Sequence, residues 1–166
     1  MIASRDPAFA RDHGYLYVPR LLPAARLDPL RAILQGALER RGWLRDGRSD
    51  PALRLGGSED ARWIDFLNEV MSSASFHALG RAPEILSLLR AIFGREPQSS
   101  AGDVCRLVSP GAVDLTTPPH QDASYLPADV WAAWLPIEDC PLELGPLAIL
   151  PDSHRCGILS QAILEK

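Results

Sequence analysis

Residues 120–157 of the chain read HQDASYLPADVWAAWLPIEDCPLELGPLAILPDSHRCG. Within this stretch, residues 130–137 and 146–150 form short runs that are apolar or alternate apolar with polar side chains, and clusters of Pro, Gly and Asp separate them. Residues 104–108 form a similar run shortly before it. Short runs bounded by turn-forming residues are typical of β-strands, so the sequence predicts roughly three or four strands beyond about residue 100.

The first part of the chain, to about residue 95, has the periodicity of helices instead. Apolar side chains recur at positions i, i+3, i+4, i+7 and i+8 in residues 63–71 and again in residues 85–93, which places them on one face of each helix. Ser58, which two acidic residues follow, is the predicted N-cap of the first of these helices. Pro83 and Gly94 are predicted to bound the second.

A leucine repeat over residues 27–38 predicts a further helix. Because proline disrupts the interior of a helix, this one either starts at Pro29, with Asp28 as its cap, or bends there. Gly42 is predicted to end it. Residues 45–57, which are rich in Gly, Arg and Asp, form a predicted loop.

Helices followed by short strands indicate an α+β protein whose strands pair mostly antiparallel, in a sandwich, jelly roll or barrel. The length of 166 residues suits a single domain, residues 1–166, with a mainly helical part over residues 1–98 and a strand part over residues 99–166. A closed jelly roll uses about eight strands, which is more than this sequence supplies.

The net charge and the cysteines indicate which partners and which cellular compartment to expect. The formal net charge of −4 is small and spread along the chain, so nucleic acid is not an expected partner. The three cysteines, Cys105, Cys140 and Cys156, form neither a CxxC pair nor an even set, which fits a reducing compartment. The N-terminal residues are charged where a signal peptide is apolar, and the longest apolar run is far shorter than the ~20 residues of a membrane helix. We therefore expect a cytoplasmic protein with no membrane contact.

The most informative local feature is the segment Pro118-Pro119-His120-Gln121-Asp122. In an extended chain, residues two apart project to the same side, so His120 and Asp122 would converge while Gln121 faces away or edges the site. One imidazole and one carboxylate are two of the three ligands of the 2-His-1-carboxylate triad that holds non-haem Fe(II). The alternative is a turn that follows the proline pair and binds nothing.

The order of motifs around this pair resembles the phytanoyl-CoA dioxygenase family. An HQD segment (residues 120–122) is followed by an aromatic residue, a Trp-Leu-Pro strand (134–136), an acidic turn, a Gly-Pro-Leu strand (145–147) and a Pro-x-Ser-His-x-x-Gly loop (151–157). The Asp-His-Gly-Tyr-Leu opening at residues 12–16 is also similar to the family's entry segment. The resemblance thus runs from about residue 9 to about residue 160.

The resemblance implies N-terminal helices followed by a double-stranded β-helix, a jelly-roll or cupin-like arrangement. It also implies an enzyme that uses Fe(II), 2-oxoglutarate and O₂ to hydroxylate a small organic substrate. His120 and Asp122 would be the first histidine and the carboxylate of the iron site, and Gln121 and Trp134 match positions near the 2-oxoglutarate pocket. Because related halogenases have a small residue in place of the carboxylate, Asp122 favours hydroxylation.

Arg106 is a further candidate for binding the co-substrate. It lies within residues 104–108, a run that would line the barrel, and its permanently charged guanidinium needs a partner there. That partner is either a bound carboxylate, such as that of 2-oxoglutarate, or solvent on the outer side. His13 has no convergent partner in the sequence, and a surface or packing role is predicted for it.

The sequence departs from the family after Asp122. The family's second iron histidine, and the arginine that pairs with 2-oxoglutarate, lie on late strands, whereas the only histidine and arginine after Asp122 here are His154 and Arg155. His154 either substitutes as a ligand or is a loop residue that hydrogen-bonds near the mouth of the site. Asp152 replaces a glycine that is common in that loop.

Two functions follow from this departure. In the first, the chain is the N-terminal portion of a dioxygenase and its β-helix is incomplete, so the second iron histidine and the 2-oxoglutarate arginine are missing. In the second, it is a degenerate, non-catalytic protein that binds a small molecule or a partner subunit and covers its exposed strand edges, for instance by forming dimers. The sequence leaves the substrate and the oligomeric state open.

Overall fold

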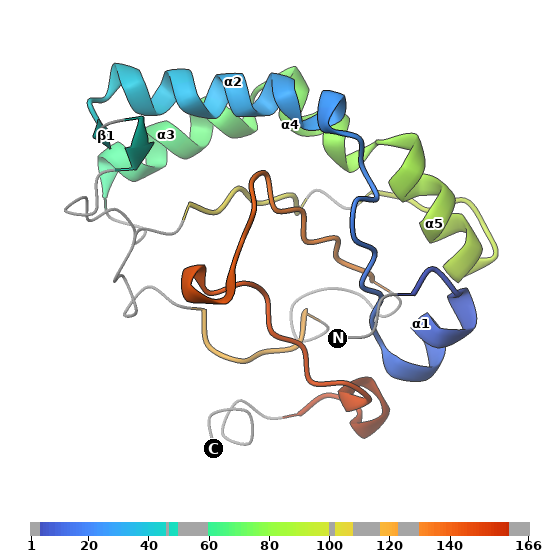
Figure 1. Cartoon of the computed structure of the whole chain (residues 1–166). Coiled ribbons are helices and arrows are strands. Elements are labelled where there is room, and N and C mark those ends of the chain that lie inside the picture. Colours follow the sequence, from blue (N-terminus) through green and yellow to red (C-terminus); the bar gives the residue numbers. More distant parts are fainter. Residues whose placement is uncertain are drawn as a thin grey trace.

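The computed structural model describes residues 4–45, 47–49, 60–99, 102–107, 117–122 and 130–159. These residues form the helices α1 (Pro7–His13), α2 (Ala24–Arg40), α3 (Ala61–Met71), α4 (Ala74–Gly80) and α5 (Pro83–Phe93), the strands β1 (Leu44–Arg45) and β2 (Arg48–Ser49), and the 3-10 turns η3 (Leu142–Leu144) and η4 (Ser153–Cys156). No helix among these residues is long and apolar enough to cross a membrane. In Figure 1, α2 to α5 form a layer, and the described residues beyond 100 lie beneath it.

Helix α3 confirms the helix predicted over residues 63–71, but its cap differs from the prediction. The Asp60 side chain accepts a hydrogen bond from the backbone N–H of Arg62 at 3.1 Å, so Asp60 is the N-cap and the helix begins at Ala61. The predicted cap, Ser58, lies outside the described residues, as does most of the predicted loop over residues 45–57. An acidic side chain suits this position because it also interacts favourably with the helix dipole.

Helix α5 confirms the second predicted helix at both ends. Pro83 occupies the first turn, where its missing N–H costs no hydrogen bond. Gly94 ends the helix with φ of 65°, a left-handed conformation that glycine adopts without steric cost. Ile85 and Ile92 are buried on its apolar face.

Helix α2 begins earlier than the sequence predicts. Pro23 is its N-cap residue, the first helical residue is Ala24, and Pro29 lies inside the helix. The prediction that the helix starts at Pro29 with Asp28 as its cap is therefore wrong. Pro29 is close enough to the N-terminus that few intrahelical N–H bonds precede it, which limits what the missing donor costs.

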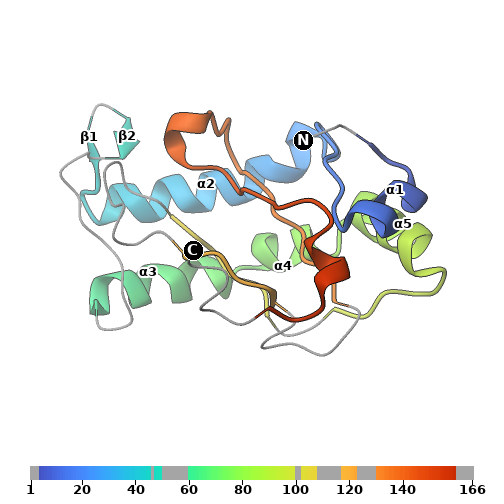
Figure 2. The same ribbon diagram turned by 90° about the horizontal axis from the view of Figure 1, so that it is seen from below.

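Phe66 of α3 lies at the centre of the helical layer. It is fully buried, and the rings of Trp43 and Trp63 each lie 5.6 Å from it, centroid to centroid. The buried core consists of Leu30, Ala37, Leu38, Trp43, Phe66, Val70 and Leu79. This core joins α2, α3 and α4, and Figure 2 shows α2 and α3 running next to each other, while α1 packs against α5.

The described part of the chain does not contain the predicted double-stranded β-helix. Its only strands are β1 and β2, a short antiparallel pair in which Leu44 faces Ser49. The described residues of the predicted strands (104–107, 130–137 and 146–150) belong to no strand, and residue 108 lies outside the description. The prediction of an α+β fold with an incomplete β-helix is therefore wrong, and the described fold is rich in helix.

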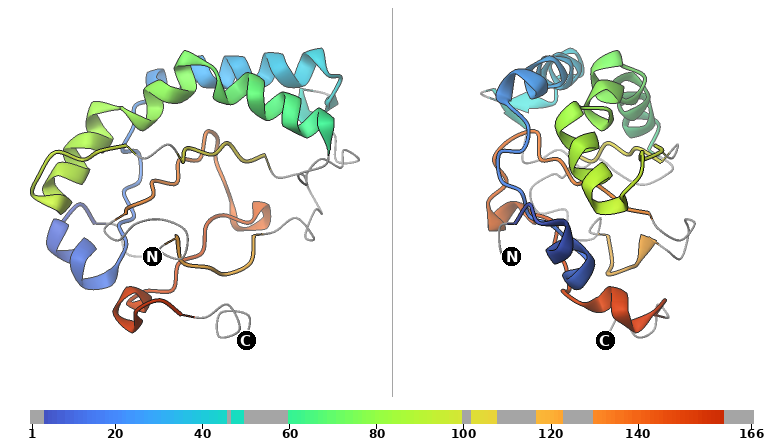
Figure 3. Two further views of the ribbon diagram at one scale, coloured as in Figure 1. Left: turned by 180° about the vertical axis from the view of Figure 1, so that it is seen from behind. Right: turned by 90° about the vertical axis from the view of Figure 1, so that its right-hand side faces the viewer.

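The alternation that suggested strands has another cause. Cys105 and Leu107, and likewise Leu135 and Ile137, are residues two apart, and all four pack against the core of the helical layer. The backbone carbonyl of Ile137 also accepts a hydrogen bond from Arg31 Nε at 2.7 Å. These segments therefore lie on the helices with alternate side chains turned toward them. Figure 3 shows their backbone running along the helical layer.

Candidate functional site

His120 is held by a carbonyl of its own segment. Its Nδ1 atom lies 2.8 Å from the carbonyl oxygen of Pro118. Because a carbonyl oxygen only accepts, Nδ1 carries the proton, and the lone pair of a neutral ring is then on Nε2. This is the tautomer that a metal-binding histidine needs when a backbone carbonyl orients it.

Asp122 lies next to the free nitrogen of His120. The distance from His120 Nε2 to Asp122 Oδ1 is 3.3 Å, and the two side chains are 37% and 48% exposed. Two ligands at about 2.1 Å from a metal ion, with a right angle between them, lie about 3 Å apart. A protonated imidazole would form an ion pair with this carboxylate, and a neutral imidazole would share a cation with it. The pair therefore fits two neighbouring positions around a metal ion.

Gln121 points its amide toward a distant part of the chain. Its Nε2 donates to the carbonyl oxygen of Gly157 at 3.1 Å, and its Oε1 accepts from the backbone N–H of Leu159 at 2.7 Å. The two bonds use a donor and an acceptor of one amide and so fix which way it points. The structure thus joins the HQD segment to residues 157–159.

Arg106 and Trp134, the other two residues predicted to bind the co-substrate, differ in how they relate to this pair. Arg106 Nη1 donates to the Thr117 hydroxyl, and Thr117 directly precedes the proline whose carbonyl holds His120. Among the described residues Arg106 has no carboxylate partner, so its charge is not neutralised there. Trp134 is 46% exposed. Within the described residues its ring stacks on neither His120 nor Asp122 and forms no hydrogen bond with them.

The loop that contains η4 is bound to the end of α1. The backbone N–H of Asp152 donates to the carbonyl of His13, and the Asp152 carboxylate lies 3.1 Å from His13 Nδ1. Arg155 donates to the carbonyl oxygen of Asp12 at 2.7 Å. His13 therefore has a partner that the sequence did not reveal, because Asp152 lies 139 residues further along.

Comparison with known proteins identifies the family. The family model described as Phytanoyl-CoA dioxygenase (PhyH) matches residues 10–162. The chain belongs to the phytanoyl-CoA dioxygenase family. No curated protein and no solved structure matches the chain. The resemblance seen in the sequence is thereby confirmed over most of its length.

Phytanoyl-CoA dioxygenase family members are generally oxygenases that depend on Fe(II) and 2-oxoglutarate, so a small-molecule substrate and O₂ are the partners that the family suggests. The matched region includes the HQD segment and the loop that contains η4. Among the described residues, however, no group of three or more His, Cys, Asp or Glu side chains is arranged to hold a metal ion.

His154 is the histidine that the phytanoyl-CoA dioxygenase resemblance left open as a substitute ligand. Its Nε2 lies 3.0 Å from the carbonyl oxygen of Arg11 and so carries a proton directed at that oxygen. Its Nδ1 lies against Gly14, where an added Cβ would be only 2.4 Å away. Nε2 is therefore bound at the end of α1 and Nδ1 lies close to the backbone of Gly14, which favours a structural role for His154.

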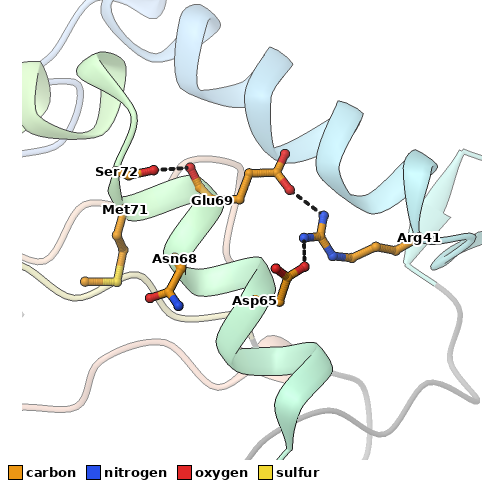
Figure 4. Close-up of a pocket in the computed structure, with 6 residues that line it drawn as sticks. All are labelled: Arg41, Asp65, Asn68, Glu69, Met71 and Ser72. Carbon is orange, nitrogen blue, oxygen red and sulfur yellow. Dashed lines mark hydrogen bonds and ion pairs between the residues drawn. The ribbon is translucent and has the colours of Figure 1, made fainter.

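A shallow pocket on this phytanoyl-CoA dioxygenase family member lies away from the HQD segment. It has a volume of about 750 Å³ and is lined by Arg41, Asp65, Asn68, Glu69, Met71 and Ser72 (Figure 4). Arg41 binds both Asp65 and Glu69 across it, and this hydrogen bond from Arg41 holds the pKa of Glu69 below its usual range. Arg40 also donates to Glu69, so two arginines balance the two carboxylates and the pocket lacks a net charge to select a ligand.

Proposed function

We propose that the chain carries two ligands of the iron site of a 2-oxoglutarate-dependent oxygenase that hydroxylates a small organic substrate. Membership of the phytanoyl-CoA dioxygenase family supports the reaction class. One observation supports the choice of these two residues. His120 Nε2 lies 3.3 Å from Asp122 Oδ1, while Nδ1 donates a hydrogen bond to the Pro118 carbonyl oxygen.

The residues that bind iron in this proposal are His120 and Asp122. When bound, iron would activate O₂ and 2-oxoglutarate would supply two of the four electrons that reduce it, so that the other two can come from a substrate C–H bond. His120 offers the Nε2 lone pair, while Pro118 keeps the Nδ1 proton away from the ion. The Asp122 carboxylate neutralises part of the ion's charge. One nitrogen and one oxygen from this pair would leave other coordination positions of the ion open for a further ligand and the co-substrate.

Arg106 is our candidate for a contact with 2-oxoglutarate. Its hydrogen bond to Thr117 ties it to the segment that bears His120, and its charge lacks a carboxylate partner among the described residues. A guanidinium in this position can bind a carboxylate with two parallel hydrogen bonds. Trp134 stays a candidate on the strength of the family resemblance alone, whereas both polar ends of the Gln121 amide already bind backbone groups.

A titration tests the metal site. Fe(II), or Co(II) as a spectroscopic substitute, is added anaerobically to the purified chain, with and without 2-oxoglutarate. We expect one ion to bind, and His120→Ala or Asp122→Ala to weaken binding at least about 10-fold, since each removes a ligand. The matched control is His77→Ala, which removes an exposed histidine of α4 and leaves binding unchanged. Unchanged affinity in His120→Ala would overturn the assignment.

The second candidate function is a non-catalytic protein that binds a small molecule or a partner. The engagement of His154 at α1, together with the lack of a three-residue metal group in the described chain, favours it. The two candidates differ in turnover. An oxygenase converts 2-oxoglutarate to succinate and CO₂ in an iron-dependent reaction, whereas the non-catalytic protein forms no succinate, even with excess iron and ascorbate.

A further inference from the structure

Gln121 stands between the two proposed metal ligands, and its amide is already used. The amide NH₂ donates to Gly157 and the amide oxygen accepts from Leu159, so both of its polar ends bind backbone. The two backbone groups lie two residues apart on one segment, so two hydrogen bonds hold Gln121 to residues 157–159, and we call this pair of bonds the Gln121 clip. Among the side chains of similar length, only glutamine offers a neutral donor and a neutral acceptor together.

The segment at the other side of the clip is itself held in place. Residues 152–155 bind the end of α1 through the Asp152 N–H to the His13 carbonyl and through Arg155 to the Asp12 carbonyl. The chain continues from this anchored loop directly into Gly157 and Leu159. The clip therefore ties the HQD segment, over 36 and 38 residues of sequence, to a part of the chain that is fixed to the first helix.

The other bonds of the metal pair are local. His120 binds the carbonyl of Pro118, two residues before it, and Asp122 lies against His120. Such bonds orient the two side chains relative to their own segment, but they do not place that segment in the molecule. The clip from Gln121 does so on the carboxyl side, and the bond from Arg106 to Thr117 does so on the amino side.

We propose that Gln121 is a positioning residue of the metal site, which holds His120 and Asp122 at their mutual distance by clamping their segment to residues 157–159. This inference rests on the proposed metal site and assigns Gln121 a role other than direct contact with 2-oxoglutarate. Residues that orient metal ligands typically change metal affinity about 10- to 100-fold when they are removed.

Three variants test the proposal. Gln121→Leu keeps the approximate size of the side chain and removes both hydrogen bonds. Gln121→Glu keeps an acceptor for the Leu159 N–H and loses the donor to Gly157. Gln35→Leu is the matched control, because Gln35 of α2 makes only an exposed side-chain hydrogen bond to Glu39 at 2.8 Å. Each variant is measured as the full chain for Co(II) affinity, Co(II) absorption spectrum, melting temperature without metal, and hydrogen exchange of the Leu159 amide.

We expect Gln121→Leu to speed exchange of the Leu159 amide, to weaken Co(II) binding about 10-fold and to change the Co(II) spectrum, which reports ligand geometry. Gln121→Glu should lie between it and the wild type. Gln35→Leu should match the wild type in amide exchange, Co(II) affinity and Co(II) spectrum. The melting temperatures of all the variants without metal should stay close to that of the wild type. A merely structural role would lower the melting temperature and leave the affinity and the Co(II) spectrum unchanged.

Two results would overturn the inference. Unchanged exchange at Leu159 in Gln121→Leu would mean that the clip does not exist in solution. Faster exchange with unchanged Co(II) affinity would mean that the clip exists but does not position the ligands. Failure of the proposed function looks different, because the wild type itself would then bind no Co(II) in a manner sensitive to His120→Ala, and the role of Gln121 would fall with it.

Discussion

The two prolines before His120 contribute to the metal site through the backbone. Pro118 has a ring-restricted φ, and the ring of Pro119 further confines Pro118 to an extended conformation. These restrictions limit where the Pro118 carbonyl can point, and that carbonyl accepts a hydrogen bond from His120 Nδ1. A flexible residue at either position would let the imidazole turn. The proline pair is therefore part of the site, although neither ring carries chemistry.

The cysteines give a test at the scale of single residues. Burial raises the pKa of the Cys105 thiol, which packs against the helical core, whereas Cys156 is exposed. Because the thiolate is the reactive form, we expect iodoacetamide at pH 8 to modify Cys156 at least about 10-fold faster than Cys105 in the native chain. Mass spectrometry of a time course measures this, and both should react alike in guanidinium chloride. Equal rates in the native chain would contradict the packing of Cys105 against the helical core.

The sequence reveals the site only as far as its contacts are local. His120 and Asp122 could be paired in advance because they are two residues apart. The partners of Gln121 and His154 lie 36 to 143 residues away, and no pattern in either stretch of sequence encodes them. One signal was available for the loop, where the resemblance places a glycine at residue 152. Asp152 has φ of 64°, a left-handed value that glycine adopts freely and that Asp tolerates.

At the scale of elements, the junction of α1 with the η4 loop depends on Gly14. This residue ends α1 with φ of 74°, and an added Cβ would lie 2.4 Å from Nδ1 of His154. We expect Gly14→Ala to destabilise the chain by about 2 kcal/mol, from backbone strain together with displacement of the imidazole. In a His154→Ala background the same change should cost only about 1 kcal/mol, because the strain alone remains.

Chemical denaturation of the four chains of this double-mutant cycle measures the coupling. Gly94→Ala is the control for strain alone, since Gly94 ends α5 with φ of 65° and an added Cβ there would meet nothing within 4 Å. Additive effects of Gly14→Ala and His154→Ala would show that the imidazole does not lie on Gly14 in solution.

The ion pairs between α2 and α3 predict a pH dependence. The hydrogen bond from Arg41 lowers the pKa of Glu69, so Glu69 stabilises the fold fully above its unfolded pKa of about 4.3, and this contribution is lost as the pH falls through the lower folded value. The Glu69 side chain is 32% exposed, and solvent screening limits the contribution to about 1 kcal/mol. Glu69→Gln should therefore unfold more easily than the wild type at pH 7, and the difference should disappear toward pH 3.

Urea denaturation at pH 7, 5, 4 and 3 gives this comparison. Glu143→Gln in η3 serves as the control, because Glu143 forms no ion pair among the described residues. A difference between the wild type and Glu69→Gln that grows as the pH falls would have the wrong sign and would exclude the ion pair as its cause.

The helices were the most predictable elements because their signals are local. The apolar periodicity and the terminal Pro and Gly located α3 and α5 within a few residues of their bounds. The start of α2 was left open because Pro29 predicted either the start of the helix or a bend, and the structure places Pro29 inside the helix near its N-terminus. Helix α4 has seven residues, too few for a periodic pattern to repeat, and its only clear signal is Ser73, which caps it.

At the scale of the whole molecule, the second half of the chain was misread because alternation has two explanations. Period-two alternation shows that one face of an extended segment is buried, and a helical layer can bury that face as well as a sheet can. A strand also requires a neighbour that supplies backbone N–H and C=O groups. The sequence carries no record of that neighbour, so it could not separate a paired strand from residues 130–137 lying on α2.

Apolar burial is concentrated in the helical half of the molecule. The largest fully buried side chains are Phe66 and Val70, both from α3. Most of the large apolar side chains that are exposed among the described residues lie beyond residue 100, namely Val104, Val130, Trp134, Leu142, Leu144, Leu147, Leu150 and Ile158. Local stability follows buried apolar contacts and protected backbone hydrogen bonds. The two halves should therefore differ in how readily they open.

Hydrogen exchange measured along the whole chain tests this difference. In the structure, the amides of residues 130–137 donate no backbone hydrogen bond to another described residue, whereas those in the body of α3 donate to the helix. We expect the α3 amides of Phe66 and Val70 to exchange at least about 100-fold more slowly than those of residues 130–137, relative to unfolded peptides. The N–H of Leu144, which donates to Pro141 at 3.0 Å, should lie between them. Strong protection at every second amide of residues 130–137 would contradict this arrangement, because that pattern requires pairing with a neighbouring strand at an edge.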